Sequence, residues 1–252
     1  MPSTPVSSAA EPRIHVIHEN AEWSAPLFDA LTARGAAHED WHMGDFALDL
    51  TIPPPKGVFY NRMSASSHTR GHRYAPEMTT GLLHWLEASG RRVLNGSRAV
   101  ALEINKVAQY AALARAGLAV PDTVACHTAE QIMAAHARFG DRPVITKHNR
   151  AGKGLGVKLF RDADSLDAYV SGRTFEPSVD GITLLQSYIE APAPFITRVE
   201  FICDADDRPF VYDVNTNTNY NREAESRAGV SAMDSLAAYL QAELAAGRRD
   251  AA

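Results

Sequence analysis

The chain has 252 residues, of which 45% are hydrophobic and 22% charged, an ordinary composition for a globular protein that buries a core. Its formal net charge of −5 provides no overall basic field, so nucleic acid is not expected as a partner. The two cysteines, Cys126 and Cys203, lie far apart, which argues against a disulfide framework or a cysteine zinc site.

Targeting signals are not evident in the sequence. Residues 1–12 have neither the basic start nor the apolar run of a signal peptide, and we expect them to form a flexible tail. No apolar stretch approaches the roughly 20 residues that a membrane span requires. We therefore expect a cytoplasmic protein without a membrane partner.

Strand and helix patterns alternate in the first part of the chain and predict an α/β domain over residues 13–95. A strand is expected at 13–17, and a helix around 27–34 that ends before Gly35. Further elements follow in chain order: a strand at 57–60, a polar loop at 61–74, a helix at 76–88 and a strand at 93–94.

The remainder, residues 96–252, is expected to form a second domain. Helices are predicted at 102–116 and 128–139, the latter with a capping box of Thr128 and Gln131. Then follow a strand from 144, a glycine-rich loop at 151–156, a second strand, a helix at 164–170 and a strand at 183–187. A hairpin of strands at 196–203 and 210–214 and a helix at 231–246 complete the pattern.

The glycine-rich loop is the first feature that can carry chemistry. Lys147 ends one strand, and Gly152, Gly154 and Gly156 precede the next. Glycines allow backbone N–H groups to approach phosphate oxygens, and a neighbouring lysine adds positive charge. Because the loop joins two strands, it fits neither a Rossmann nor a Walker A motif. A glycine-rich turn without a ligand is the alternative.

A second feature is a group of hard-oxygen side chains near the C-terminal hairpin. Asp213 and Asn215 alternate along a strand and so share a face, and Glu200 lies on the expected partner strand. Carboxylate and amide oxygens suit Mg²⁺. Arg198 shares the face of Glu200 and can grip an anion. A cross-strand salt bridge on a solvated face is the alternative.

Two further observations are open to more than one interpretation. Alternate asparagines, among them Asn217 and Asn219, lead to Arg222 and form either a substrate-binding wall or a polar loop with Asx turns. Lys106, on the helix predicted at 102–116, either turns inward to phosphate or faces solvent.

The order of these features resembles the ATP-grasp superfamily, and more closely the RimK-like glutamate ligases. The likeness rests on Lys106, Lys147, the glycine loop, the strand that ends in QSYI and the D-x-N strand. The junction of the two domains also looks like that of the family, with GVFYNRMSASSHTRGHRYAPE and NGSRAVALEINKVAQYAALARAGLAVPDT. Two departures are a short segment between Ile189 and Arg198, and NTNTNYN after the metal-binding strand.

The resemblance implies an α/β fold with an N-terminal pre-ATP-grasp lobe, a lid subdomain over about 122–183 and a C-terminal antiparallel lobe. It implies ATP as the nucleotide, bound by Lys106, Lys147 and the glycine loop with Lys153 in it. The adenine would meet a hinge formed by Gln186, Ser187, Tyr188 and Ile189. Mg²⁺, which Mn²⁺ can replace, would be held by Glu200, Asp213 and Asn215.

The implied reaction joins a carboxylate to an amine through an acyl phosphate. Arg198 would then stabilise the oxyanion of the tetrahedral intermediate. Arg62, Arg70 and Arg73, with His72 beside them, lie in the loop near the domain junction and are our candidates for binding an acidic substrate; a solvent-exposed basic loop is the alternative. The partners would be a small acid and an amine or a peptide, and the family likeness suggests a homo-oligomer.

Three alternative functions share some of these sequence features. The segment His38–His42 spells HEDWH and matches the H-E-x-x-H motif of zinc hydrolases, but that motif requires a helix, whereas this segment follows an expected helix end at Gly35. We assign the match to chance. An ATP-grasp kinase and a non-catalytic nucleotide-binding protein would carry the same phosphate-binding residues as a ligase.

Overall fold

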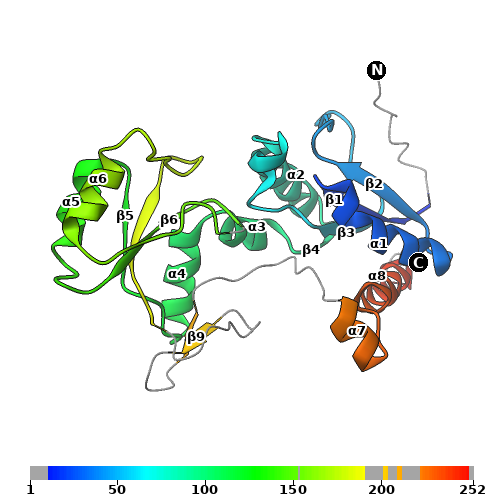
Figure 1. Ribbon diagram of the computed structural model, residues 1–252. Coiled ribbons are helices and arrows are strands. Elements are labelled where there is room, and N and C mark those ends of the chain that lie inside the picture. The colour runs from blue at the N-terminus through cyan, green and yellow to red at the C-terminus, as the bar shows by residue number, and fades with distance from the viewer. Residues whose placement is uncertain (1–10, 153, 191–200, 204–208, 212–221, 250–252) are drawn as a thin grey trace. The chain divides into compact units, whose positions relative to one another are not determined.

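The computed structural model describes residues 11–152, 154–190, 201–203, 209–211 and 222–249 (Figure 1). Two compact units are formed, one by residues 1–100 and 216–252 and the other by residues 101–215. Mixed α/β structure is present, with one parallel sheet and two antiparallel sheets, as the sequence predicts.

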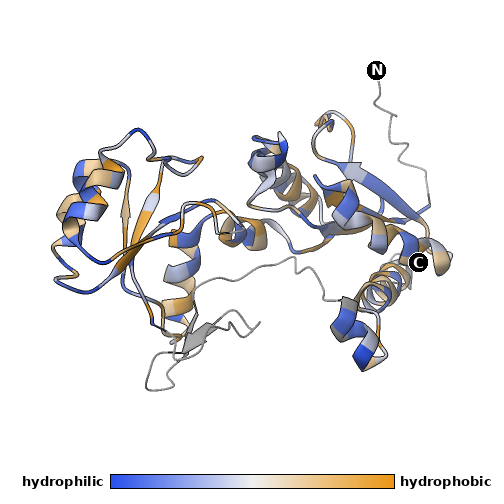
Figure 2. Cartoon of the chain, in the orientation of Figure 1, coloured by the Kyte–Doolittle hydropathy of each residue, from blue (hydrophilic) through white to orange (hydrophobic). Residues whose placement is uncertain are grey.

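The first unit is built on a four-stranded parallel sheet with the strand order β2-β1-β3-β4. Its helices carry both polar and apolar sides, as Figure 2 shows, which is typical of helices that cover a sheet. Its elements are β1 (Arg13–His18), α1 (Ala21–Ala33), β2 (His38–His42), β3 (Gly57–Asn61), the 3₁₀ helix η1 (Ser67–Arg70), α2 (Ala75–Ala88), β4 (Arg92–Leu94), α7 (Arg222–Ala228) and α8 (Ala232–Arg249).

The C-terminal helix α8 packs against α1, β1 and β3 and completes the core of the first unit. The helix contributes Ala237, Leu240 and Leu244, which are buried against Ile14 and Val58 of the sheet. Burying a leucine side chain contributes about 1.5–3 kcal/mol. The sequence-based division at residue 96 placed this helix with the second domain, whereas its packing groups it with the first unit.

The HEDWH segment forms β2, an element that the sequence pattern did not reveal. A strand cannot present two histidines four residues apart as the helical zinc motif does. Among the residues that the structure describes, no group of three or more His, Cys, Asp or Glu side chains is placed to hold a metal ion.

The second unit contains a four-stranded antiparallel sheet with the order β5-β8-β6-β7. Helices α5 and α6 pack together on one face of this sheet (Figure 1). A two-stranded antiparallel pair, β9 with β10, follows. The elements are α4 (Lys106–Arg115), β5 (Thr123–Cys126), α5 (Ala129–His136), β6 (Val144–His148), β7 (Lys158–Phe160), α6 (Ala163–Val170), β8 (Thr183–Ser187), β9 (Phe201–Cys203) and β10 (Pro209–Val211).

The core of the second unit lies between the sheet and helices α5 and α6. Ile132 and Leu166 of the helices pack there against Val144 and Leu185 of the strands. Cys126 belongs to the same core, and burial raises the pKa of its thiol. This environment agrees with a structural role for Cys126.

One predicted helix is divided in the structure. Residues 102–116 were expected to be continuous, but α3 (Ser97–Glu103) ends before α4 begins at Lys106. Asn105 causes the break, because its extended backbone lets the side chain accept a hydrogen bond from the N–H of Ala108 at 3.1 Å.

None of the helices in the described part of the chain combines the length and the apolar character that crossing a bilayer requires.

Candidate functional site

The glycine-rich loop joins β6 to β7 in a hairpin whose strands are antiparallel. Inside the loop, the N–H of Val157 donates to the carbonyl of Gly154 at 3.1 Å. The Thr146 hydroxyl on β6 donates to the carbonyl of Gly156 at 3.0 Å and fixes the far end of the loop. The predicted order of strand, glycine loop and strand is therefore confirmed.

Lys106 is buried at the start of α4, with a relative exposure of 4%. Its ammonium donates to the carbonyl of Ala151 in the glycine loop at 2.8 Å. A cation in the first turn of a helix opposes the helix dipole, and burial of an ammonium group costs free energy. Proteins often tolerate such unfavourable placements at functional sites, and a bound anion can offset them. The inward orientation considered for Lys106 is the one observed.

Lys147 is another buried lysine among the described residues of this unit, at 8% exposure near the end of β6. It donates a hydrogen bond of 3.0 Å to the hydroxyl of Tyr110. Tyr110 follows Lys106 by one turn of α4, so the two side chains lie along the same face of that helix. Both ammonium groups are thus placed along α4, close to the root of the glycine loop.

The strand register shows what surrounds Lys147 on the sheet. Ile145 lies opposite Leu159 on β7 and Gln186 on β8, and Lys147 lies opposite Leu184. These residues share the face that points away from α5 and α6, because Val144, their neighbour in the chain, points into the core beneath those helices. Leu159 is 40% exposed. Leu184 and Gln186, by contrast, are buried, so Leu159 is the exposed apolar side chain on this face.

Residues 186–189, expected to read adenine through their backbone, follow β8. The N–H of Ser187 donates to the carbonyl of Asp122 at 2.9 Å. The N–H of Tyr188 donates to the carbonyl of Pro143 at the same distance. Since the unit itself uses these two donors, any recognition of a base by this segment depends on its other backbone groups.

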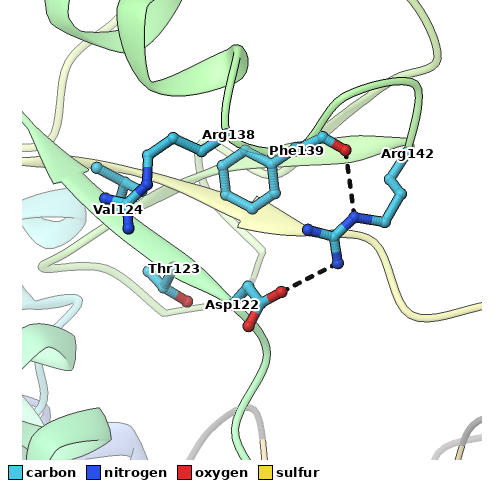
Figure 3. A pocket seen from close by; sticks show the side chains of 6 residues that line it. All are labelled: Asp122, Thr123, Val124, Arg138, Phe139 and Arg142. Carbon is cyan, nitrogen blue, oxygen red and sulfur yellow. Dashed lines mark hydrogen bonds and ion pairs between the residues drawn. The ribbon is translucent and has the colours of Figure 1, made fainter.

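A separate depression of about 270 Å³ lies beside this segment (Figure 3). Arg142 donates to the carboxylate of Asp122 at 3.0 Å across it and to the carbonyl of Phe139 at 3.2 Å. The residues that line the depression are Asp122, Thr123, Val124, Arg138, Phe139 and Arg142. Lys106, Lys147 and the glycines of the loop are not among the residues that line this depression. The depression is therefore distinct from the candidate phosphate site.

Arg70, one of the residues expected to bind an acidic substrate, is engaged within the first unit. Its Nε donates to the carboxylate of Glu19 at 3.0 Å, and its Nη1 to the Ser66 hydroxyl at 3.1 Å. The guanidinium also lies 4.7 Å from the centre of the Trp23 ring. Glu19 is buried, so this pair holds together the carboxyl edge of the parallel sheet and balances the charge of Arg70.

The other two arginines of this loop differ in exposure. Arg62, directly after β3, is 8% exposed, and its Nη1 lies 3.7 Å from the sulfur of Met233. Arg73 forms an ion pair of 3.0 Å with Glu77, and both side chains are partly exposed to solvent. All three arginines belong to the first unit.

Several expected site residues lie outside the described residues. They are Lys153 of the glycine loop, the oxyanion candidate Arg198, the metal candidates Glu200, Asp213 and Asn215, and the asparagines Asn217 and Asn219. Arg222 begins α7.

The sequence interpretation missed two residues that hold this site together. Tyr110 contacts Lys147, and Asn149 contacts the start of α4. Tyr110 could have been found from its spacing of four residues after Lys106 on a helix. Asn149 carries no such signal, because its partners are distant in sequence.

Comparison with known proteins identifies relatives in sequence and in fold. No protein-family model matches the chain. A tetrahydromethanopterin:alpha-L-glutamate ligase of Methanosarcina acetivorans is 31% identical over 117 residues, which cover 44% of this chain and 36% of the relative. The match thus spans about a third of that enzyme's length.

Solved structures match over a larger part of the chain. A RimK domain ATP-grasp protein of Sphaerobacter thermophilus has a TM-score of 0.66 and 20% identity, covering 90% of this chain and 98% of its own. The ATP-grasp ligase PsnB, in complex with a minimal precursor, has a TM-score of 0.63 and 18% identity, covering 93% of this chain and all of its own. The chain therefore has the ATP-grasp fold, and within that fold it is similar to RimK-like ligases.

Proposed function

We propose that this protein is an ATP- and Mg²⁺-dependent ligase that joins a carboxylate to an amine. The observation that carries the proposal is the pair of buried lysines, Lys106 and Lys147, held along α4 beside the glycine loop. Burial costs each ammonium group part of its hydration, and bound phosphate oxygens would offset that loss. The similarity to a glutamate ligase and to ligases of the same fold supports this reaction class.

In the reaction, a substrate carboxylate oxygen attacks the γ-phosphorus of ATP, and the bond to ADP breaks. The amine nitrogen then attacks the carbonyl carbon of the acyl phosphate, phosphate leaves and the amine loses a proton. Phosphoryl transfer of this kind depends mainly on alignment and on neutralisation of charge. Lys106 and Lys147 would supply that charge, and the glycine loop would exclude water from the acyl phosphate.

The metal would bind to the oxygen-rich group of Glu200, Asp213 and Asn215, whose carboxylates and amide fit Mg²⁺. Mg²⁺ would neutralise phosphate charge in this site. Arg198 would stabilise the oxyanion formed when the amine attacks.

For the substrate, we propose an amino acid or a peptide. The names of the relatives support this class, since one is a glutamate ligase and another was solved with a precursor. Arg62 and Arg73 are the stronger candidates for binding the acid, because the carboxylate paired with Arg70 is buried, whereas the ion pair of Arg73 with Glu77 is partly exposed to solvent. Replacing Arg62 and Arg73 with alanine should raise the KM for the acid, and an unchanged KM would remove both from this role.

The test is ADP release from ATP and Mg²⁺ across a panel of amino acids and other small carboxylates paired with amines. A ligase releases ADP only with one acid and one amine, and it forms the amide in equal amount. The Lys147→Met and Asp213→Ala variants should lose this release. ADP without consumption of amine would instead show a kinase, and binding of ATP without turnover by any pair would favour a nucleotide-binding protein.

A further inference from the structure

Asn149 is fully buried at the root of the glycine loop, directly after β6. Its side-chain oxygen accepts from the N–H of Val107 at 3.0 Å, and its carbonyl accepts from the N–H of Lys106 at 3.4 Å. Its side-chain N–H donates to the carboxylate of Asp180 at 2.6 Å, and its backbone N–H donates to the carbonyl of Ile182 at 3.1 Å. One residue thus joins the start of α4 to the loop that precedes β8.

These hydrogen bonds determine what the start of α4 can bind. The first N–H groups of a helix have no partner within the helix and often bind anions. Here Asn149 accepts from the first two, on Lys106 and Val107, and Asn105 accepts from the third, on Ala108. The backbone of this helix start is therefore already occupied, and an anion near it must be bound by side chains.

The segment of residues 149–151 holds Lys106 both at its backbone nitrogen and at its side-chain ammonium. Its backbone N–H donates to Asn149, and its ammonium donates to the carbonyl of Ala151, two residues further on. Asn149 in turn follows Lys147 by two residues. The position of Lys106 relative to Lys147 and to the glycine loop thus depends on the contacts of Asn149.

We propose that Asn149 is a positioning residue for the triphosphate of ATP, which acts by fixing the ammonium of Lys106 beside the glycine loop. This inference rests on the proposed function, because it requires ATP to bind at this site. Asparagine supplies both a donor for Asp180 and an acceptor for Val107. Aspartate would set two carboxylates against each other, and alanine would remove the acceptor of the Val107 N–H and one of the hydrogen bonds to Asp180.

The experiment measures the Kd for ATP with Mg²⁺ by calorimetry, without acid or amine, in the full chain. Asn149→Ala should weaken binding roughly tenfold, which corresponds to about 1.4 kcal/mol. The same substitution in a Lys106→Ala background should cause almost no further loss, since it acts through Lys106. A general folding defect would instead weaken binding equally in both backgrounds.

Exchanging the donor and the acceptor between residues 149 and 180 tests whether their hydrogen bond is what ATP binding requires. Asn149→Asp alone should weaken ATP binding, and adding Asp180→Asn should restore most of it, because the new amide can donate to the new carboxylate. As a matched control, Asn20→Ala removes the asparagine cap of α1, which accepts from the N–H of Trp23 at 3.0 Å. This control lies in the first unit and should leave the Kd unchanged.

The outcomes separate the two proposals. If the wild-type protein binds ATP and Asn149→Ala binds it equally well, or if its loss is the same with and without Lys106, the role of Asn149 is refuted while the ligase proposal stands. If the wild-type protein binds no ATP, both are refuted. If ATP binds and Asn149 couples to Lys106 while no acid and amine pair is joined, only the ligase proposal fails.

Discussion

At the scale of single residues, Gly154 and Gly156 of the glycine loop have nearly the same backbone conformation but different surroundings. Their φ angles are +74° and +73°, in the left-handed region that glycine favours. A Cβ added at Gly156 would overlap the His148 ring, whereas one at Gly154 would meet no atom within 4 Å. The two positions therefore separate backbone strain from steric overlap.

We predict that Gly154→Ala lowers the free energy of unfolding by about 1–2 kcal/mol, the cost of a left-handed residue with a side chain. Gly156→Ala should cost more, because His148 must also move, and its ring lies 2.7 Å from the carbonyl of Glu176. Urea unfolding followed by circular dichroism measures both values. Equal losses for the two variants would contradict the predicted displacement of His148.

His18 provides a prediction about pH. It is buried at the end of β1, 2.7 Å from the Asp40 carboxylate, and its ring centre lies 5.3 Å from that of His42. Burial lowers the pKa of His18 below its ordinary value of 6.5, although Asp40 opposes the effect. As the pH falls below 6.5, the unfolded chain takes up this proton before the folded one does. The contribution of neutral His18 to the free energy of unfolding is therefore fully present above pH 6.5 and is lost as the pH falls below it.

The slope attributable to His18 is at most about 1.4 kcal/mol per pH unit. His18→Asn should flatten the decline in the free energy of unfolding as the pH falls below 6.5, measured by tryptophan fluorescence in urea. His84→Asn is the control, since that side chain is 68% exposed. Parallel stability curves for wild type and His18→Asn would exclude His18 as the source of the decline.

At the scale of secondary structure, α8 should be essential for the stability of the first unit. Leu240 is fully buried against the parallel sheet, whereas Tyr239 beside it is 48% exposed. Leu240→Ala should lower the free energy of unfolding by about 2–5 kcal/mol through lost burial and a cavity. Tyr239→Ala should have a much smaller effect. Similar effects of the two variants in urea unfolding would refute the packing described for α8.

The elements that the sequence predicts well are those whose own residues determine them. The strand expected at 183–187 coincides with β8, which is buried along its whole length. The helix expected from Thr128 has that residue as its cap, with the N–H of Gln131 donating to its hydroxyl at 3.2 Å. Local signals of this kind do not require knowledge of the rest of the fold.

The elements that the sequence missed depend on distant partners. The segment His38–His42 has only Trp41 fully buried, and it becomes a strand through its pairing with β1. For the candidate site, Lys106 and Lys147 were proposed from the order of motifs. The spacing of four residues after Lys106 on a helix could have indicated Tyr110, whereas the role of Asn149 arises from a contact between segments roughly 40 residues apart.

At the scale of the whole molecule, each of the two units has a hydrophobic cluster of its own among the described residues. One contains residues of α1, α8 and the parallel sheet, and the other contains residues of α5, α6 and the antiparallel sheet. No described residue belongs to both clusters. The described candidates for ATP binding, namely Lys106, Lys147, the glycine loop and residues 186–189, all belong to the second unit. The three tryptophans, at positions 23, 41 and 85, all belong to the first.

This separation allows ATP binding to be assigned to one unit. A ligand that binds only folded protein stabilises it by about 2.7 kcal/mol at 100 times its Kd. ATP with Mg²⁺ should therefore slow hydrogen exchange of residues 144–187 in the second unit. It should leave the urea transition of tryptophan fluorescence, which reports the first unit, unchanged. Lys147→Met should abolish the protection, because it removes one of the two buried ammonium groups. A shift of the tryptophan transition by ATP would contradict the assignment, since it would require nucleotide contacts from the first unit, where Arg62 and Arg73 lie.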